Sequence, residues 1–279
     1  MRYQDRVVAF IDILGFRARL DSTVDKDNND IEENIDELYG IHKMIIDIFD
    51  TKLSKKFKKI ANSSKEVSVF SDCIAISFLV KDESEIFSTL LEIKWFIMGL
   101  TKSSLLCRGA LSYGKLIHTE EMIFGPALVE AYLMESKAAL YPRVILDKSI
   151  IDLVNKSNSR HSPEEEKEYI ISLLGKDSDG MFYIDYFSKA QEELDDPEYD
   201  FPEYVDTLGD IIRKGLRGSS HPSKVDLRVK YYWMKEKYNE LIDRCQNIEF
   251  INYLIENDEG ELAKYYQKLK KINPYSRIN

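Results

Sequence analysis

Hydrophobic positions in the first part of the chain follow two patterns, one typical of a strand and one typical of a helix. Residues 6–13 (RVVAFIDI) are mostly β-branched, aromatic or apolar and end at a Leu-Gly-Phe turn. This pattern predicts a buried strand with Asp12 near its C-terminal end. Between about residues 30 and 51, apolar side chains recur at helical spacing, which predicts a helix packed on a sheet.

The alternation of strands and helices continues to residue 147 and indicates one α/β unit. Residues 65–80 contain two apolar runs joined at Ser71 and Asp72, which predicts a hairpin with a carboxylate at its tip. The remaining predicted elements of this unit are a helix at 83–101, a strand pair at 105–118, a helix at 125–140 and a strand at 143–147.

Beyond residue 150 the pattern becomes mainly helical. We therefore expect residues 1–150 to form the α/β domain and residues 151–279 to form a mainly helical extension packed on it. Its predicted elements are a helix at 163–174, a strand at 181–187, an acidic surface loop at 192–204 and a long helix at 225–245.

Composition narrows the classes of partner. The chain has 39 Lys and Arg against 49 Asp and Glu, a formal charge of −10 over 279 residues. Such an acidic protein is unsuited to binding nucleic acid through phosphate neutralisation, so no nucleic-acid partner is expected. With 44% hydrophobic residues and few Gly and Pro, the chain has enough apolar side chains for a sizeable core.

Nothing in the sequence predicts a membrane or secreted protein. The longest apolar run, residues 74–80, is far shorter than the roughly 20 residues that cross a bilayer. The N-terminus lacks the long apolar segment of a signal peptide. Cys73, Cys107 and Cys245 form neither a disulfide framework nor a zinc pattern, so we expect a cytoplasmic location.

Asp12 and Asp72 are the candidate chemical groups. Each lies at the edge of an apolar strand, where an uncompensated charge is costly. Two carboxylates from adjacent strands suit Mg²⁺ or Mn²⁺, which prefer oxygen ligands and share substrate phosphates. The turn at Gly15 and Phe16 adds backbone N–H groups suited to a triphosphate. Taken singly, either aspartate is also compatible with a purely structural role.

Four motifs resemble, in order and spacing, the catalytic core of the class III nucleotidyl cyclases: FIDILGF (10–16), VFSDCIAIS (69–77), RGALSYG (108–114) and GPALVEAYLMES (125–136). The resemblance covers about residues 5–147. It implies a ferredoxin-like α/β sandwich that acts as a homodimer with sites at the subunit interface. It also implies that Asp12, Asp72 and the carbonyl of Ile13 bind two Mn²⁺ or Mg²⁺ ions per site.

The chain departs from that family at the residues that read a purine. Ser68 and Met122 stand at those two positions, and neither reproduces the adenine-reading or guanine-reading pair. Where the family places an Asn and a transition-state Arg, this chain has Val129 and Leu133. Lys137, one further turn along the same helical face, is geometrically the best substitute cation, and Arg108 and Arg143 are the other candidates. Taken singly, each of the three is also compatible with a surface position or a structural ion pair.

The combined motifs look like a divergent branch of the family, the pyrimidine cyclases of the Pycsar antiphage system. This resemblance implies conversion of UTP, or else CTP, to the 3′,5′-cyclic monophosphate and pyrophosphate, and a separate effector activated by the product. Ser68 and Met122 would then line a pyrimidine pocket, with Gly15, Phe16 and Arg143 also contacting the substrate.

Two other functions stay open. A degenerate cyclase-like module that binds a nucleotide or a partner is favoured by Val129 and Leu133, and purine cyclase activity is a further alternative. A diguanylate cyclase is disfavoured, because FSDCIA lacks the paired glycines and the Asp-Glu-Phe run of that family. Glu135 is expected in a buried ion pair. The dispersed His42, His118, His161 and His221 are expected to be structural.

Overall fold

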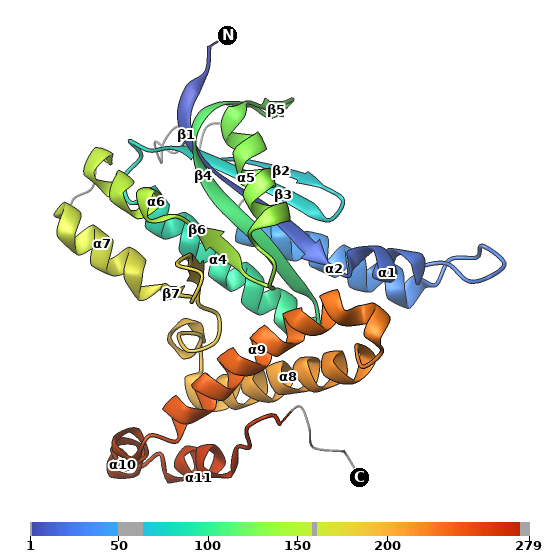
Figure 1. The fold of residues 1–279 in the computed structure, drawn as a ribbon, viewed down its shortest axis with the longest axis vertical. Coiled ribbons are helices and arrows are strands. Elements are labelled where there is room, and N and C mark those ends of the chain that lie inside the picture. The colour runs from blue at the N-terminus through green and yellow to red at the C-terminus, as the bar shows by residue number, and fades with distance from the viewer. Residues whose placement is uncertain (1, 50–63, 158–160, 274–279) are drawn as a thin grey trace. The chain divides into compact units, whose positions relative to one another are not determined.

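The computed structural model describes residues 2–49, 64–157 and 161–273, and the chain divides into two compact units. The first unit, Met1–Ile184, is built on one mixed sheet with the strand order β2-β3-β1-β4-β6-β8-β7, and a short β5 pairs with β4 (Figure 1). The predicted α/β fold class is confirmed. The strands are β1 Gln4–Leu14, β2 Glu66–Phe70, β3 Cys73–Leu79, β4 Leu106–His118, β5 Ile123–Phe124, β6 Val144–Leu146, β7 Leu174–Lys176 and β8 Phe182–Ile184.

Helices of the first unit cover both faces of this sheet. Helices α2 and α4 pack together, with Gly99 of α4 against the side chain of Met44 of α2, and Phe96 of α4 lies 5.4 Å from Phe49 between ring centroids. Helix α5 packs on β1 and β4. The helices are α1 Phe16–Asp21, α2 Glu32–Ile48, α4 Glu85–Lys102, α5 Pro126–Lys137, α6 Lys148–Asp152 and α7 Pro163–Ser172, with a 3₁₀ turn at Leu153–Lys156.

The long central strand β1 sets the two faces of the sheet. It runs antiparallel to both β3 and β4, and successive side chains point to opposite faces. Val7 and Ile11 are fully buried on one face. Val8 lies on the other face in a cluster with Ala127 and Ala131 of α5. Asp12 shares this second face, because it has the same parity as Val8.

Small residues allow α5 to lie close to the sheet. Besides the two alanines, the hydroxyl of Ser112 on β4 donates to the carbonyl of Ala127 at 2.6 Å. Gly125, immediately before α5, has φ of 152°, and a Cβ there would lie 2.5 Å from the carbonyl oxygen of Lys115. Only glycine fits this approach without a shift of the backbone.

Two of the predicted elements are wrong in whole or in part, and a third extends beyond the described residues. The predicted strand pair at 105–118 is wrong: β4 is one continuous strand, because its alternating pattern stays paired with β1 from Leu106 to Leu116. The predicted helix at 30–51 corresponds to α2, and its residues 50 and 51 lie outside the described part of the chain.

The acidic loop predicted at 192–204 is also wrong in its second half, where helix α8 begins at Pro197. Pro197 occupies the first helical turn, and Glu198 and Asp200 lie in that turn, where acidic side chains interact favourably with the helix dipole. Phe201 and Tyr204 are buried, so this acidic segment also contributes to a core.

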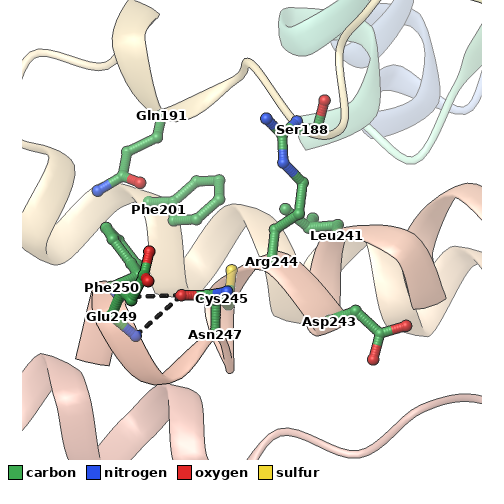
Figure 2. Close-up of a pocket in the computed structure, with 10 residues that line it drawn as sticks. All are labelled: Ser188, Gln191, Phe201, Leu241, Asp243, Arg244, Cys245, Asn247, Glu249 and Phe250. Carbon is green, nitrogen blue, oxygen red and sulfur yellow. Dashed lines mark hydrogen bonds between the residues drawn. The ribbon is translucent and has the colours of Figure 1, made fainter. Parts of the chain in front are cut away.

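The second unit is Asp185–Asn279, whereas the sequence pattern places the start of the helical extension at residue 151. The described elements of this unit are helices and 3₁₀ turns. Its two long helices, α8 and α9, pack against each other. A cavity of about 560 Å³ in this unit is lined by Phe201, Arg244, Cys245 and neighbouring residues (Figure 2). The elements are α8 Pro197–Gly218, α9 Val225–Cys245, α10 Ile248–Glu256 and α11 Gly260–Lys268, with 3₁₀ turns at Gln191–Glu193 and Pro222–Lys224.

Across the described residues of both units, every helix is too short or too polar to pass through a lipid bilayer.

The contact at Gly125 gives a stability prediction. Replacing Gly125 with Ala should lower the free energy of unfolding by about 1–3 kcal/mol, because the new Cβ must displace the β4 backbone. Urea unfolding followed by circular dichroism measures this loss.

Gly40→Ala is the matched control. Gly40 lies within α2 with no heavy atom within 4 Å of an added Cβ, so alanine should stabilise the protein by about 0.5–1 kcal/mol. A Gly125→Ala variant as stable as the wild type would contradict this account of how α5 approaches the sheet.

Candidate functional site

Strand register brings the two candidate aspartates together. Asp12 lies near the C-terminal end of β1, directly opposite Cys73, the first residue of β3. Asp72 precedes Cys73 in a turn where Ser71 has φ of 56°. The N–H of Ile13 donates to the carbonyl of Asp72 at 2.9 Å, which fixes the turn to the end of β1. The predicted hairpin with a carboxylate at its tip is therefore present.

The side chains of Asp12, Asp72 and Cys73 converge. One ligand atom from each lies within 4.8 Å of the others. Divalent ions such as Mg²⁺ bind oxygen at about 2.0–2.1 Å, so carboxylate oxygens at this separation are compatible with a shared ion or with two adjacent ions. Two protein carboxylates leave further coordination positions for water and phosphate oxygens.

The thiol of Cys73 adds little to a hard metal site. Its Sγ lies 3.9 Å from a carboxylate oxygen of each aspartate. Burial and then the nearby negative charges raise the pKa of Cys73 to about 12. The thiol is therefore neutral near pH 7, and the donor set is dominated by oxygen. This chemistry fits Mg²⁺ or Mn²⁺ better than a softer ion.

Arg108 and Glu135 complete the charged cluster. Arg108 lies opposite Asp12 on β4, and its Nε is 3.4 Å from an Asp12 oxygen and 2.6 Å from Oε1 of Glu135. Glu135 is only 2% exposed, which confirms the expected buried ion pair. Three carboxylates and one guanidinium leave an excess of negative charge, which favours a divalent cation.

Helix α5 points Glu135 inward and Lys137 outward. Ala127, Ala131 and Glu135 are spaced by four residues and form the buried side of the helix. Lys137 follows the spacing of Val129 and Leu133 on another side, and it is exposed. Within one chain, Lys137 therefore faces away from Asp12, whereas Arg108 lies beside it.

Arg143 lies in a different environment. Its side chain is buried, and it donates to Asp177 at 2.6 Å and also to Asp179. Burial alone would raise the pKa of Asp179, but the hydrogen bond and charge of Arg143 lower it. The sequence is compatible with a structural ion pair at Arg143, and the structure shows such a pair with Asp177 and Asp179.

The turn after β1 places backbone groups beside the aspartates. Gly15 has φ of 82° and precedes α1, whose first-turn N–H groups have no acceptor within the helix. The side chain of Phe16 is buried and packs edge-on against His42 at 5.7 Å between ring centroids. Phe16 is thus available to a ligand only through its backbone.

Ser68 belongs to a hydrogen-bonded chain across the sheet. Its hydroxyl lies 2.9 Å from Nε2 of His118, and Nδ1 of His118 lies 2.8 Å from the hydroxyl of Ser77. Arg6 donates to that same hydroxyl at 2.8 Å. His118 and Ser77 are buried, and Met122 lies in the exposed turn that follows His118.

His118 was expected to be structural, and its relation to Ser68 was not anticipated. The sequence does contain a signal for this position: His118 and Arg108 are an even number of residues apart on β4, so their side chains lie on the same face of the sheet. That signal requires β4 to be read as one strand rather than a pair. Cys73 directly follows Asp72 in the sequence, and this adjacency was the available signal for its place beside the two aspartates.

Comparison with known proteins gives weak likenesses to cyclase structures. No protein-family model and no curated protein matches the sequence. A bacterial light-regulated adenylyl cyclase aligns with a TM-score of 0.38 and 13% identity over 55% of this chain, which spans less than half (45%) of that protein's length. The adenylyl cyclase CyaB from P. aeruginosa aligns with a TM-score of 0.40 and 12% identity over 66% of this chain and 95% of that one.

The guanylyl cyclase domain of the RhoGC fusion protein from the aquatic fungus Blastocladiella emersonii aligns similarly. Its TM-score is 0.37 at 15% identity, over 66% of this chain and 95% of that one. At TM-scores below 0.5, these likenesses assign neither a family nor an activity to the chain.

The convergence of carboxylates predicts a divalent-cation site. Wild-type protein should reduce the electron paramagnetic resonance signal of free Mn²⁺ in a titration. Asp12→Asn and Asp72→Asn should each weaken this binding by about tenfold or more, because each removes a charged oxygen donor.

Asp5→Asn is the control on the same strand, because Asp5 pairs with Lys115 outside the cluster. Equal Mn²⁺ affinity in Asp5→Asn, Asp12→Asn and Asp72→Asn would show that the cluster is no metal site.

Proposed function

We propose that the chain is a class III-type nucleotidyl cyclase that converts a nucleoside triphosphate to its 3′,5′-cyclic monophosphate and pyrophosphate. The observation that carries the proposal is the convergence of Asp12 and Asp72 beside the turn at Gly15. Together they offer oxygen ligands for cations and backbone N–H groups for phosphate. The motif resemblance identified in the sequence supports the same reaction.

The reaction needs positioning and charge compensation more than covalent catalysis. The ribose 3′-oxygen attacks the α-phosphorus, the bond from that phosphorus to the β-phosphate oxygen breaks, and the 3′-hydroxyl loses its proton. Bound Mn²⁺ or Mg²⁺, two per site in this proposal, would promote that deprotonation and neutralise the phosphoryl oxygens. Asp12, Asp72 and the carbonyl of Ile13 would hold the ions.

Arg108 is our candidate for the transition-state cation. It lies beside Asp12, and Glu135 contacts its guanidinium group from α5. Because Glu135 is buried, it acts as a positioning residue for Arg108 rather than as a catalytic one. Lys137 of a second copy remains the alternative cation, since it is exposed on α5.

We further propose a pyrimidine substrate, with UTP ahead of CTP. Ser68 has a short polar side chain oriented by His118, and Met122 is exposed in the adjacent turn. A hydroxyl with a fixed partner suits hydrogen bonding to a base edge. Production of a cyclic pyrimidine messenger that activates a separate effector in cytoplasmic antiphage defence follows from the motif resemblance alone.

A homodimer fits the open face around the aspartates. Phe70 lies opposite Cys73 in the strand register and is 53% exposed, so it lies on the same face as Asp12. Tyr132 of α5 packs on Phe10 of that face and is also exposed. Exposed aromatic groups around a charged site are typical of an interaction surface.

A binding module is the second candidate. Val129 and Leu133 replace the polar residues of active cyclases, and Lys137 faces away from Asp12 within one chain. Binding of a nucleotide without turnover would be the outcome under that function.

Turnover separates the two functions. Incubation with each ribonucleoside triphosphate and Mn²⁺, followed by chromatography, should give a cyclic monophosphate from UTP or CTP. Asp12→Ala and Asp72→Ala should lower the rate by about 10²-fold or more, because charge compensation of the triphosphate is lost. Asp5→Ala should retain it. Nucleotide binding with no product from any substrate favours the binding module.

Base selectivity tests Ser68 and His118. Ser68→Ala should change the ratio of kcat/KM between UTP and CTP by about tenfold, because one hydrogen bond to the base is lost, while the Mn²⁺ requirement stays unchanged. His118→Gln should change the same ratio less, since it disturbs only the orientation of Ser68. An unaltered ratio in Ser68→Ala would remove Ser68 from the base site.

A further inference from the structure

A basic cavity in the second unit has no role in the proposed reaction. Its volume is about 390 Å³, within the range of small-molecule sites. Every charged residue that lines it in the described part of the chain is cationic, although the whole chain carries a net charge of −10. The five cations are Arg213, Arg217, Arg228, Lys270 and Lys271.

Close packing of α8 and α9 brings the arginines together. Arg213 and Arg217 lie one turn apart on α8, and Arg228 lies on α9. Between the two α8 arginines, a Cβ on Gly215 would come within 2.3 Å of ring atoms of Tyr231 on α9. Glycine at this position therefore permits the two helices to approach closely beside the cavity.

The segment after α11 supplies the two lysines and is held in place. The side chain of Asn239 on α9 accepts the N–H of Ile272 at 2.8 Å and donates to its carbonyl at 3.2 Å. The side chain of Ile272 is buried. On the other side of the two lysines, the side chain of Gln246 donates to the carbonyl of Leu269 at 2.8 Å, so the backbone that carries Lys270 and Lys271 is held at both ends.

Only two of the five cations have acidic partners within the described residues. Arg213 lies 3.3 Å from Asp210, and Lys271 lies 2.6 Å from Asp243. Both pairs are solvent-exposed, so each compensates its cation only weakly.

The other three cations have no carboxylate within 4.0 Å among the residues that the structure describes. Arg228 lies over the ring of Tyr232 at 5.5 Å, whereas Arg217 and Lys270 are exposed. Like charges gathered around one cavity repel each other, and an anion of high charge would relieve that repulsion.

The larger cavity of the same unit offers a contrast. Figure 2 shows Arg244 among its lining residues together with Asp243 and Glu249, so both signs of charge are present. The charged residues that line the basic cavity are all cationic within the described part of the chain, and Leu216, Tyr232 and Ile272 add an apolar part to its lining.

We propose that the basic cavity binds a small anion with two or more linked phosphate groups, either free or as part of a nucleotide. A partly open cavity of about 390 Å³ has room for such a molecule, whereas a nucleic-acid strand requires a continuous groove. The inference is independent of the proposed reaction, because the two sites use different residues.

The test is isothermal titration calorimetry on the full chain in buffer with EDTA. The protein carries Asp12→Asn and Asp72→Asn, so that the candidate active site contributes no metal-dependent binding. Inorganic tripolyphosphate should bind at one site per chain, with an affinity that falls as salt rises. Adding Arg217→Glu and Lys270→Glu should weaken binding by about tenfold or more, because two attractive charges become repulsive.

Lys214→Glu is the matched control, because it makes a charge change on the exposed side of α8 without lining the cavity. The affinity of this control for tripolyphosphate should equal that of the protein that carries only Asp12→Asn and Asp72→Asn. The neutral pair Arg217→Gln and Lys270→Gln, with thermal unfolding as a check of folding, should give an intermediate loss.

Comparison of tripolyphosphate with UTP shows whether the cavity recognises phosphates alone or a whole nucleotide. Equal affinity for tripolyphosphate and UTP assigns recognition to the phosphates alone, and tighter binding of UTP assigns it to a nucleotide. The proposal is overturned by absent binding of both at millimolar concentration, by equal affinity in the Arg217/Lys270 variants and in Lys214→Glu, or by tighter binding of a short single-stranded RNA.

Discussion

The antiparallel register of β1 with β3 is the constraint on which the site depends. It places Asp12 opposite Cys73, and the hydrogen bond from Ile13 to the carbonyl of Asp72 holds the hairpin turn against the end of β1. A slip of one residue would turn Asp12 toward the face that packs on α2 and α4, where burial of its charge would be costly. The buried residues of β1 therefore fix the position of a group that is itself only partly buried.

Charge around these aspartates is only partly compensated within the chain. Arg108 contacts both Asp12 and the buried Glu135, so one cation serves two carboxylates. Among the described residues, no Lys or Arg side chain pairs with Asp72, which fits the proposed cation site. The second unit shows the converse arrangement, because cations gather around a cavity that no carboxylate lines among the described residues. In both units, incomplete internal compensation is what suggests a charged ligand.

Much of the first unit follows from local pattern. Strand β1, the hairpin at Asp72 and the helices α2, α4 and α5 were predicted because each has a clear periodicity bounded by turn residues. Strand β4 was predicted as a strand pair, whereas its residues stay paired with β1 without a break from Leu106 to Leu116. The start of α8 was missed because its acidic residues suggested a solvated loop, whereas they suit a helix N-terminus. The surroundings of Arg143, Lys137 and Ser68 depend on tertiary contacts that sequence spacing does not encode.

The most direct measurement is anomalous diffraction from crystals grown with Mn²⁺ and a non-hydrolysable nucleoside triphosphate. The account predicts manganese peaks within direct coordination distance of carboxylate oxygens of both Asp12 and Asp72, with the triphosphate bound to the same ions. Manganese bound elsewhere, or a triphosphate that lies away from both aspartates, would contradict it.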